Sequence, residues 1–349
     1  MNTEYFVIDR DHPDPCILSR AADILRRGGV VAFPTETVYG LGANGLDARA
    51  VAAIYRAKGR PADNPLILHI AQIQDVEKLA REVPACARLL MDTYWPGPLT
   101  IILKRTKAVP DCTTAGLDTV AIRLPASRIA RELIQLAGIP IAAPSANTSG
   151  RPSPTNAADV RADMDGRIDA IVDAGPCDIG VESTVIDCTA PVPTILRPGG
   201  ITLEMLQAAL GEVRWDRTQN TPENEAPRAP GMKYAHYAPS APMTLIEGNR
   251  EQRQKKIRVL AEAALAAGKR VGAVVSAETA FSLPAEVVSA VYGSQTDVKT
   301  IGNQLYTALR FFDNNPVDLI FAEGIEEKGL GRAIMNRMRK AAGHQIIRV

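Results

Sequence analysis

Short runs of β-branched and aliphatic residues alternate with amphipathic segments along most of the 349 residues, as in "GVVAFP" followed by "DARAVAAIYRAK". Apolar runs of about four to eight residues are typical of buried strands, and apolar residues three and four apart are typical of helices packed on a sheet. The alternation predicts an α/β fold with a twisted mixed sheet that carries helices. Strands are expected at 29–34, 65–70, 99–104, 119–125, 139–144, 170–175 and 183–188, and helices at about 47–58, 76–92, 127–137 and 202–210.

The character of the sequence changes between about Gly211 and Pro242, where Pro, Asn and Glu are frequent and no apolar period is present. Such a composition is typical of a linker. Beyond it the alternation resumes in "MTLIEG", "VGAVVS" and "VDLIFAEG", with amphipathic segments between these runs. We therefore expect a first domain at 1–212, a linker at 213–242 and a smaller Rossmann-like α/β domain at 243–349.

The composition argues against several classes of protein. Lys and Arg total 40 against 39 Asp and Glu, a net charge of +1, so no overall attraction to nucleic acid or to an acidic membrane is expected. The five cysteines are scattered without a C-x-x-C pair, which disfavours a disulfide framework and a thiolate zinc site. The start is too polar for a signal peptide, and no apolar run approaches the roughly 20 residues of a spanning helix. We expect a cytoplasmic protein with no membrane partner.

The stretch "PTETVYGLGANG" contains G-x-G-x-x-G in Gly40, Gly42 and Gly45, the spacing of a dinucleotide-binding loop. In that motif the first glycine ends a strand directly and a helix begins at the third. Here the expected strand ends near Phe33, six residues lie between it and the first glycine, and the expected helix is capped later by Asp47. We interpret the motif as a loop in which Gly40 and Gly42 allow the chain to turn.

The stretch "AKGRPADNPL" has two interpretations. Lys58 suits a helix C-terminus, Gly59 a left-handed cap and Pro61 a helix stop, which is a purely structural account. That account leaves Arg60 and Asn64 without a role. Lys58 and Arg60 on one loop would also form a clamp for a polyphosphate, because a lysine supplies a point charge and an arginine a planar fork.

The segment "APSANTSGRPSPT" at 143–155 follows an expected strand and offers the hydroxyl and amide groups of Ser145, Asn147 and Ser153. It reads either as an ordinary turn region or as a cradle for phosphate oxygens. The chain lacks G-x-x-x-x-G-K-[ST], H-E-x-x-H and G-x-S-x-G, so the common ATPase, zinc protease and serine hydrolase interpretations have no motif to support them.

Three further polar residues stand out in or near expected strands. Arg123 lies inside "TVAIRLP", where a charge needs either a structural ion pair or a ligand. Arg197 precedes the turn "PGG", and His69 ends the strand "PLILHI". Cations and hydroxyls gather at strand ends without an evident nucleophile and base. This combination favours the stabilisation of an anionic phosphoryl transition state over covalent catalysis.

Six motifs occur in one order: "PTETVYGLG", "KGRP…NPL", "TVAIRLP", "PSANTSG", "ESTVID" and "LRPGG". Together they resemble the YrdC-type domain of L-threonylcarbamoyladenylate synthases. "PGMKYAHYAP" and "GLGRAIMNRMRKAA" resemble the linker and the C-terminal domain of the longer, two-domain form. The resemblance covers essentially the whole chain and implies a YrdC-like catalytic domain, with the linker folding over the active site.

The resemblance implies an enzyme, a nucleotidyltransferase, that joins L-threonine, bicarbonate and ATP into threonylcarbamoyl-AMP and releases pyrophosphate. Magnesium would accompany ATP, with no protein ligands assigned. Downstream tRNA-modifying proteins would then transfer the threonylcarbamoyl group to the adenosine beside the anticodon; direct tRNA binding is not required. The family's signature tetrad of K-x-R and S-x-N falls here on Lys58, Arg60, Ser145 and Asn147.

The resemblance also distributes the substrates over the chain. L-Threonine would be bound by Thr35, His69, Arg123, the backbone of Ala143 and Ser183. ATP would be bound by Lys58, Arg60, Thr119, Ser145, Ser153 and Arg197, with Tyr234 or Tyr237 of the linker closing over it. Two alternatives stay open: a noncatalytic RNA-binding module, and a carbamoyl-transfer enzyme of related fold that uses carbamoyl phosphate.

Overall fold

The structure is a computed structural model that describes residues 2–216, 227–229 and 236–349. By internal contacts the chain divides into two compact units. The first comprises Met1–Ser149, Pro154–Asp178 and Glu182–Tyr234, and the second Gly150–Ser153, Ile179–Val181 and Ala235–Val349. This division falls inside the expected linker, whose residues 217–226 and 230–235 lie outside the described ones; the expected domain boundaries stay a prediction.

The first unit is built on an 11-stranded sheet in the order β1-β8-β2-β3-β7-β4-β6-β5-β9-β10-β11. Pairing is parallel for β4 with β6 and for β5 with β9, and antiparallel for β2 with β3 and for β5 with β6. The expected mixed sheet is therefore confirmed. Its strands are β1 (Glu4–Val7), β2 (Val31–Pro34), β3 (Tyr39–Asn44), β4 (Ile67–His69), β5 (Leu99–Lys104), β6 (Thr119–Arg123), β7 (Ile141–Ala142), β8 (Ala170–Asp173), β9 (Thr184–Asp187), β10 (Thr194–Arg197) and β11 (Arg214–Trp215).

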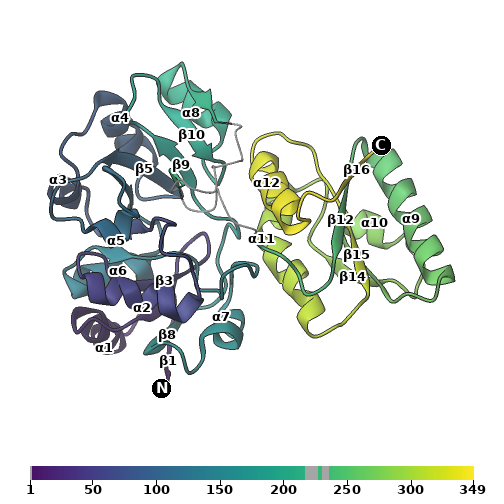
Figure 1. Cartoon of the computed structure of the whole chain (residues 1–349), viewed down its shortest axis with the longest axis horizontal. Helices are drawn as coiled ribbons and strands as arrows, with labels where there is room; N and C mark the ends of the chain where they lie inside the picture. Colours follow the sequence, from purple (N-terminus) through teal and green to yellow (C-terminus); the bar gives the residue numbers. More distant parts are fainter. Residues whose placement is uncertain (1, 217–226, 230–235) are drawn as a thin grey trace. The chain divides into compact units, whose positions relative to one another are not determined.

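Helices cover both faces of this sheet (Figure 1). One face packs on α1 and α6 through aliphatic side chains such as Leu18 and Leu133, and the other on α2, α4 and α8 through Ile54, Leu90 and Leu206. The helices are α1 (Pro15–Arg26), α2 (Ala48–Lys58), α3 (Val76–Leu79), α4 (Ala85–Tyr94), α5 (Asp111–Thr114), α6 (Arg128–Ala137), α7 (Ala157–Met164) and α8 (Leu203–Leu210), with a 3₁₀ turn at Ile73–Asp75.

Helix α2 begins and ends where the sequence predicts. The Asp47 side chain accepts a hydrogen bond from the amide of Arg49 at 2.8 Å, and Gly59 closes the helix with φ 62°. The single helix expected at 76–92 is wrong, because the structure has two, α3 and α4, separated near Pro84. Proline lacks an amide hydrogen and clashes with the preceding turn, so it starts a new helix here instead of continuing one.

The glycine-rich motif is a strand and not a turn. Gly40 and Gly42 lie inside β3, and Phe33 of β2 pairs with Gly40. A Cβ atom on Gly42 would lie 2.6 Å from the Phe33 ring and 2.8 Å from Ile141. The interpretation of these glycines as turn residues is therefore wrong: they make room for neighbouring side chains.

The second unit has a five-stranded, all-parallel sheet in the order β14-β13-β15-β12-β16. The expected Rossmann-like α/β architecture is confirmed. Its elements are β12 (Met243–Glu247), α9 (Arg250–Ala266), β13 (Val271–Val275), α10 (Ala277–Ala280), β14 (Val288–Val291), α11 (Val298–Arg310), a 3₁₀ turn at Phe311–Asp313, β15 (Leu319–Glu323), α12 (Gly331–Ala341) and β16 (Ile346–Arg348). Within the described residues, none of the helices is both long and apolar enough to span a membrane.

The packing around Gly42 can be tested by substitution. Gly42→Ala is expected to destabilise the protein by about 1–3 kcal/mol, because the new methyl group overlaps the Phe33 ring. In a Phe33→Leu background the same change should cost less, since the overlapping ring atoms are gone. The measurement is urea unfolding of the four proteins of this cycle; strictly additive effects would contradict the assigned contact.

Candidate active site

Polar side chains expected to bind threonine meet at one edge of the first sheet. His69 ends β4 and Arg123 ends β6, and the two residues are opposite each other in the parallel pair. The amide of Ala143 donates to the carbonyl of Ile67, the first residue of β4, at 3.0 Å, so the segment after β7 lies beside β4. Because carboxyl ends of parallel strands share one edge, α/β sheets commonly bind ligands there.

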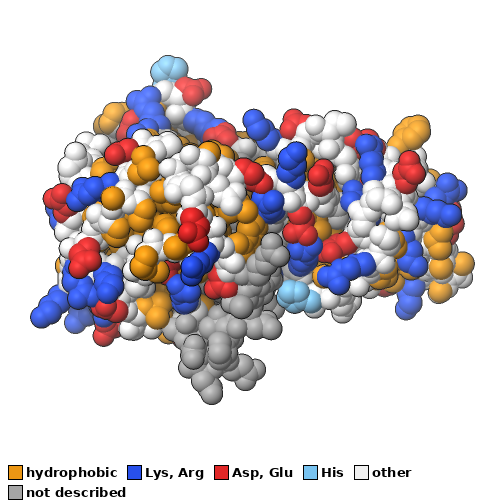
Figure 2. All heavy atoms as spheres, turned by 90° about the horizontal axis from the view of Figure 1, so that it is seen from above, with side chains coloured by type: hydrophobic (Ala, Val, Ile, Leu, Met, Phe, Trp, Pro, Cys, Tyr) orange, Lys and Arg blue, Asp and Glu red, His pale blue; other side chains and the backbone are white. Residues whose placement is uncertain are grey.

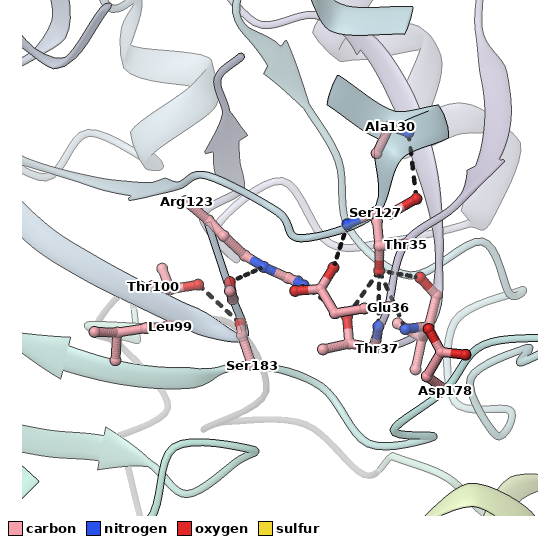
Figure 3. A network of polar contacts seen from close by, with 12 residues as sticks. Thr35, Glu36, Thr37, Leu99, Thr100, Arg123, Ser127, Ala130, Asp178 and Ser183 are labelled. Carbon is pink, nitrogen blue, oxygen red and sulfur yellow. Dashed lines mark hydrogen bonds and ion pairs between the residues drawn. The ribbon is translucent and has the colours of Figure 1, made fainter. Parts of the chain in front are cut away.

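Arg123 and Glu36 form a buried ion pair at this edge (Figure 3). Their side chains are 4% and 7% exposed, and Nη2 of Arg123 lies 2.6 Å from Oε1 of Glu36. Nη1 donates to the Thr37 hydroxyl at 3.0 Å and Nε to the carbonyl of Gly97 at 3.3 Å. The structural ion pair that the sequence left open for Arg123 is therefore present. Three of its five N–H donors are used by the chain.

Thr35 belongs to the same network. Its hydroxyl donates to the carbonyl of Val38 at 2.7 Å and lies 2.8 Å from the Thr37 hydroxyl. The Ser127 amide, at the start of α6, approaches the second carboxylate oxygen of Glu36 at 3.4 Å. A carboxylate at a helix N-terminus is favoured by the helix dipole, so α6 helps to fix Glu36.

Ser183 reaches this edge through a residue that sequence analysis missed. Its hydroxyl lies 2.8 Å from that of Thr100 on β5, and the antiparallel register of β5 with β6 places Thr100 opposite Arg123. Arg197 holds the carbonyl of Ser183 with Nε at 3.1 Å and Nη2 at 3.0 Å. The available signal was a lone threonine in the aliphatic strand "LTIILK".

The four residues of K-x-R and S-x-N come from two neighbouring loops. Lys58, the last residue of α2, is 2% exposed, and its Nζ donates to the carbonyls of Ser145 and Asn147 at 2.5 Å each. The Ser145 hydroxyl donates to Oδ1 of Asn147, also at 2.5 Å. Lys58 thus brings a buried positive charge to the loop that was expected to cradle phosphate.

Arg60 folds back over its own loop. Its Nη2 donates to the carbonyls of Asn64 at 3.3 Å and Pro65 at 3.1 Å. Asn64 is 1% exposed, and its Oδ1 atom has no hydrogen-bond partner among the described residues. A buried acceptor without a donor is costly, so Asn64 joins the site as a candidate contact for a donor group of a substrate.

The structure describes three of the four remaining expected ATP contacts. Thr119 begins β6 and so lies at the opposite end of that strand from Arg123. Ser153 is buried and belongs by contacts to the second unit. Tyr237 is also buried in that unit, with its ring stacked on Tyr306 at 5.2 Å. Tyr234 lies outside the described residues, so the role of the linker tyrosines stays a prediction.

Burial weakens three groups in this region as acids, bases or nucleophiles. Burial, and then the nearby Arg123 guanidinium, lower the pKa of His69 to about 3, so its imidazole is neutral and a weak base. Burial also raises the pKa of the Cys177 thiol and of the Tyr39 phenol, whose hydroxyl donates to the carbonyl of Gly175 at 2.7 Å. The candidate site supplies mainly fixed charge and hydrogen-bond donors.

Two family models match consecutive parts of the chain. One, for Sua5, YciO and YrdC proteins and described as telomere recombination, matches residues 23–199. The other, described as the C-terminal domain of threonylcarbamoyl-AMP synthase, matches residues 201–343. Since the first model alone covers half of the chain, the chain belongs to the Sua5/YrdC family, in its two-domain form.

Curated relatives and solved structures agree with this assignment. The chain is 51% identical over 329 residues to a threonylcarbamoyl-AMP synthase of Pyrococcus abyssi, covering 94% of this chain and 95% of the relative. It is 50% identical to one of Bacillus subtilis, covering 96% and 95%. Its structure resembles that of P. abyssi Sua5 complexed with L-threonine, with a TM-score of 0.93, 48% identity and coverage of 99% and 100%.

The lowered pKa of His69 predicts a pH dependence of stability. Between about pH 6.5 and 3 the unfolded chain binds a proton at His69 that the folded chain does not, so stability falls as pH is lowered through this range. Urea unfolding at pH 7 and pH 5 should show a loss larger by about 2 kcal/mol in the wild type than in His69→Gln. Equal losses in both proteins would contradict a buried neutral imidazole.

The ion pair of Arg123 and Glu36 predicts a large effect of a small substitution. Glu36→Gln leaves the buried guanidinium without a counter-charge and should destabilise the protein by about 3–5 kcal/mol in urea unfolding. The control is Asp118→Asn, which breaks the exposed pair of Asp118 with Arg81 and should cost less than about 1 kcal/mol. Similar losses for both variants would show that burial at the site is not what makes the pair important.

Proposed function

We propose that the chain condenses L-threonine, bicarbonate and ATP into threonylcarbamoyl-AMP and releases pyrophosphate. The observation that carries the proposal is a set of buried cations. Lys58 contacts the Ser145–Asn147 loop, and Arg123 lies at the end of β6. Family membership supports it, because relatives that cover nearly the whole chain carry the name of this activity.

The reaction has two steps that balance without a covalent enzyme intermediate. The threonine amine adds to bicarbonate and water leaves, which gives the carbamate. A carbamate oxygen then attacks the α-phosphorus of ATP, and the bond from that phosphorus to the β-phosphate bridge oxygen breaks as pyrophosphate departs. An AMP group is transferred, so the enzyme is a nucleotidyltransferase. Both steps need positioned charge more than an enzyme nucleophile.

The residue roles follow from the two clusters. Lys58, Arg60, Ser145 and Asn147 would bind the phosphates of ATP and offset the charge that develops on the departing pyrophosphate. Lys58 is preorganised for this by its two carbonyl contacts. Arg197, held on Ser183, would extend the phosphate contacts. Thr119, Ser153 and a linker tyrosine stay proposed ATP contacts on the family resemblance alone.

The threonine end would use the network of Arg123. Two guanidinium N–H groups remain beyond the three that the chain occupies, and they suit a bidentate carboxylate. The neutral imidazole of His69, the backbone of Ala143 and the hydroxyls of Thr35 and Ser183 would complete the contacts. The P. abyssi relative is described as complexed with L-threonine, which supports a threonine site in this family.

Magnesium would be held mainly by the phosphates of ATP and by water. Within the described residues no group of three or more His, Cys, Asp or Glu side chains could hold an ion, and this fits a metal that arrives with its substrate. Bound there, the magnesium ion would neutralise phosphate charge.

The product is an activated acyl donor, so we propose that separate cytoplasmic proteins transfer its threonylcarbamoyl group to tRNA; direct tRNA binding is not required.

Substrate omission tests the reaction. Pyrophosphate release from ATP should require both L-threonine and bicarbonate and proceed without tRNA. Release that is indifferent to threonine would overturn the proposal, and release that needs carbamoyl phosphate instead would identify a carbamoyl-transfer enzyme.

On the face drawn in Figure 2, basic and acidic side chains are interspersed, which argues against an RNA-binding surface there. Salt-dependent tRNA binding without turnover of ATP would nevertheless favour a noncatalytic RNA-binding module.

Substitution tests the cation cluster. Arg60→Ala and Lys58→Met should each lower kcat/KM for ATP by about 10²–10³-fold, because a charge that offsets the transition state is lost. Lys58→Met keeps most of the aliphatic volume of the buried side chain. The matched control is Lys78→Ala, which removes an exposed lysine paired with Asp75 and should leave turnover unchanged. Thermal unfolding checks that the variants fold; near-normal turnover in both folded site variants would refute the assigned roles.

A further inference from the structure

The sheet of the second unit has a point where chain connections diverge. From β12 the chain passes through α9 to β13, and from β15 it passes through α12 to β16, on the other side of β12. The helices α9 and α12 accordingly lie on opposite faces of the sheet (Figure 1). Neighbouring strands whose connections leave in opposite directions open a crevice at their carboxyl ends, and α/β proteins bind ligands in such crevices.

A cavity of about 550 Å³ lies at this point. Its volume is in the range of small-molecule sites and exceeds the need of a single inorganic ion. The residues that line it come from the ends of β12 and β15, from the segment after β14 and from α9, α11 and α12. Val298, Ile301, Ile325 and Met335 give it an apolar wall, and no motif of the sequence marks it.

A buried arginine that forms no ion pair with the described residues faces this cavity. Arg253 on α9 is 5% exposed and lines the cavity. Nη1 donates to the carbonyl of Gly248 at 2.5 Å and Nη2 to Oε1 of Gln295 at 3.1 Å, whereas Nε has no partner among the residues that the structure describes. No ion pair within the described part of the chain involves Arg253. A buried cation in this state is costly unless an anion joins it.

Three carboxylates near the cavity are engaged elsewhere, and a fourth, Glu326, lines the cavity as an exposed residue. Both oxygens of Glu323 accept hydrogen bonds, from the amide and hydroxyl of Ser276 and from the hydroxyl of Thr279. Glu247 pairs with Arg339 at 2.6 Å, and Glu327 pairs with the same arginine. The charge of Arg253 is therefore not met by these acids.

Hydrogen-bond donors gather around the same part of the cavity. Nε2 of Gln295 is buried and makes no hydrogen bond of good geometry within the described residues, although the Gln295 side chain lies beside the Tyr292 phenol; Nε of Arg253 likewise has no hydrogen-bond partner there. The 17-residue helix α9 begins here, with Asn249 as its N-cap lining the cavity. The first amides of a helix and its dipole favour an anion.

We propose that this cavity is a second ligand site, which binds a small organic oxyanion. Its phosphate or carboxylate head lies on Arg253 and Gln295 at the start of α9, and its body packs against Ile301, Ile325 and Met335. The site shares no residue with the proposed catalytic residues and would give the second unit a ligand-binding role of its own.

Hydrogen–deuterium exchange of the full-length protein tests the proposal, because it reports position. The probes are AMP for a phosphate head and succinate for a carboxylate head, at equal ionic strength, with uncharged adenosine as the control. Either anion should slow exchange in peptides spanning 248–254 and 294–301, and adenosine should not. Unchanged exchange in both peptides with both anions would overturn the proposal. Slower exchange in peptides that contain Lys58 or Ser145 would report binding at the proposed ATP site instead.

Two arginines of the same cavity give matched variants. Arg253→Met should raise the anion concentration for half-maximal protection at least tenfold. Its unfolding temperature in the absence of anion should change little, because the hydrogen bonds lost to Gly248 and Gln295 are offset by the removal of a buried cation that has no ion pair. Arg250→Gln removes an exposed cavity arginine and should change protection less than threefold. Retained protection in Arg253→Met, together with a lower unfolding temperature, would assign Arg253 a structural role and overturn the proposal. Should Arg253→Met not fold, Gln295→Leu supplies the test with the same criteria.

Discussion

The burial of two cations is the constraint that the first unit has to satisfy. Lys58 and Arg123 are each less than 5% exposed, and a buried charge without partners would destabilise the fold by several kcal/mol. Their partners are the carbonyls of Ser145 and Asn147 and the carboxylate of Glu36, all in segments that follow strands. Compensating the charges therefore also fixes the loops, which preorganises the site for an anionic substrate.

Much of the first unit could be predicted from local pattern. The strands β2, β5, β6 and β9 are β-branched runs, and α2 carries its cap and stop residues in sequence. Strand β3 was missed because Gly40 and Gly42 suggest a turn, and only the neighbouring Phe33 explains why no side chain fits there. Packing against Phe33 therefore decided the structure here, and not the preference of glycine for turns.

The candidate site, like the fold, could be predicted only in part from the sequence. The motifs identified Lys58, Ser145, Asn147 and Arg123, but not that Arg123 pairs with Glu36 or that Thr100 supports Ser183, because those contacts join residues more than 80 positions apart. The second cavity had no motif at all. It depends on strand order and on a buried arginine whose lack of an ion pair with the described residues is visible only in three dimensions.

Positioned charge, and not an enzyme nucleophile, carries the proposed reaction. The most direct measurement is the stereochemical course at the α-phosphorus, using one diastereomer of the α-thio analogue of ATP with L-threonine and bicarbonate, and determining the configuration of the thio-adenylate formed. A single in-line attack by the carbamate oxygen predicts inversion. Net retention would require two displacements through a covalent enzyme intermediate and would contradict the account.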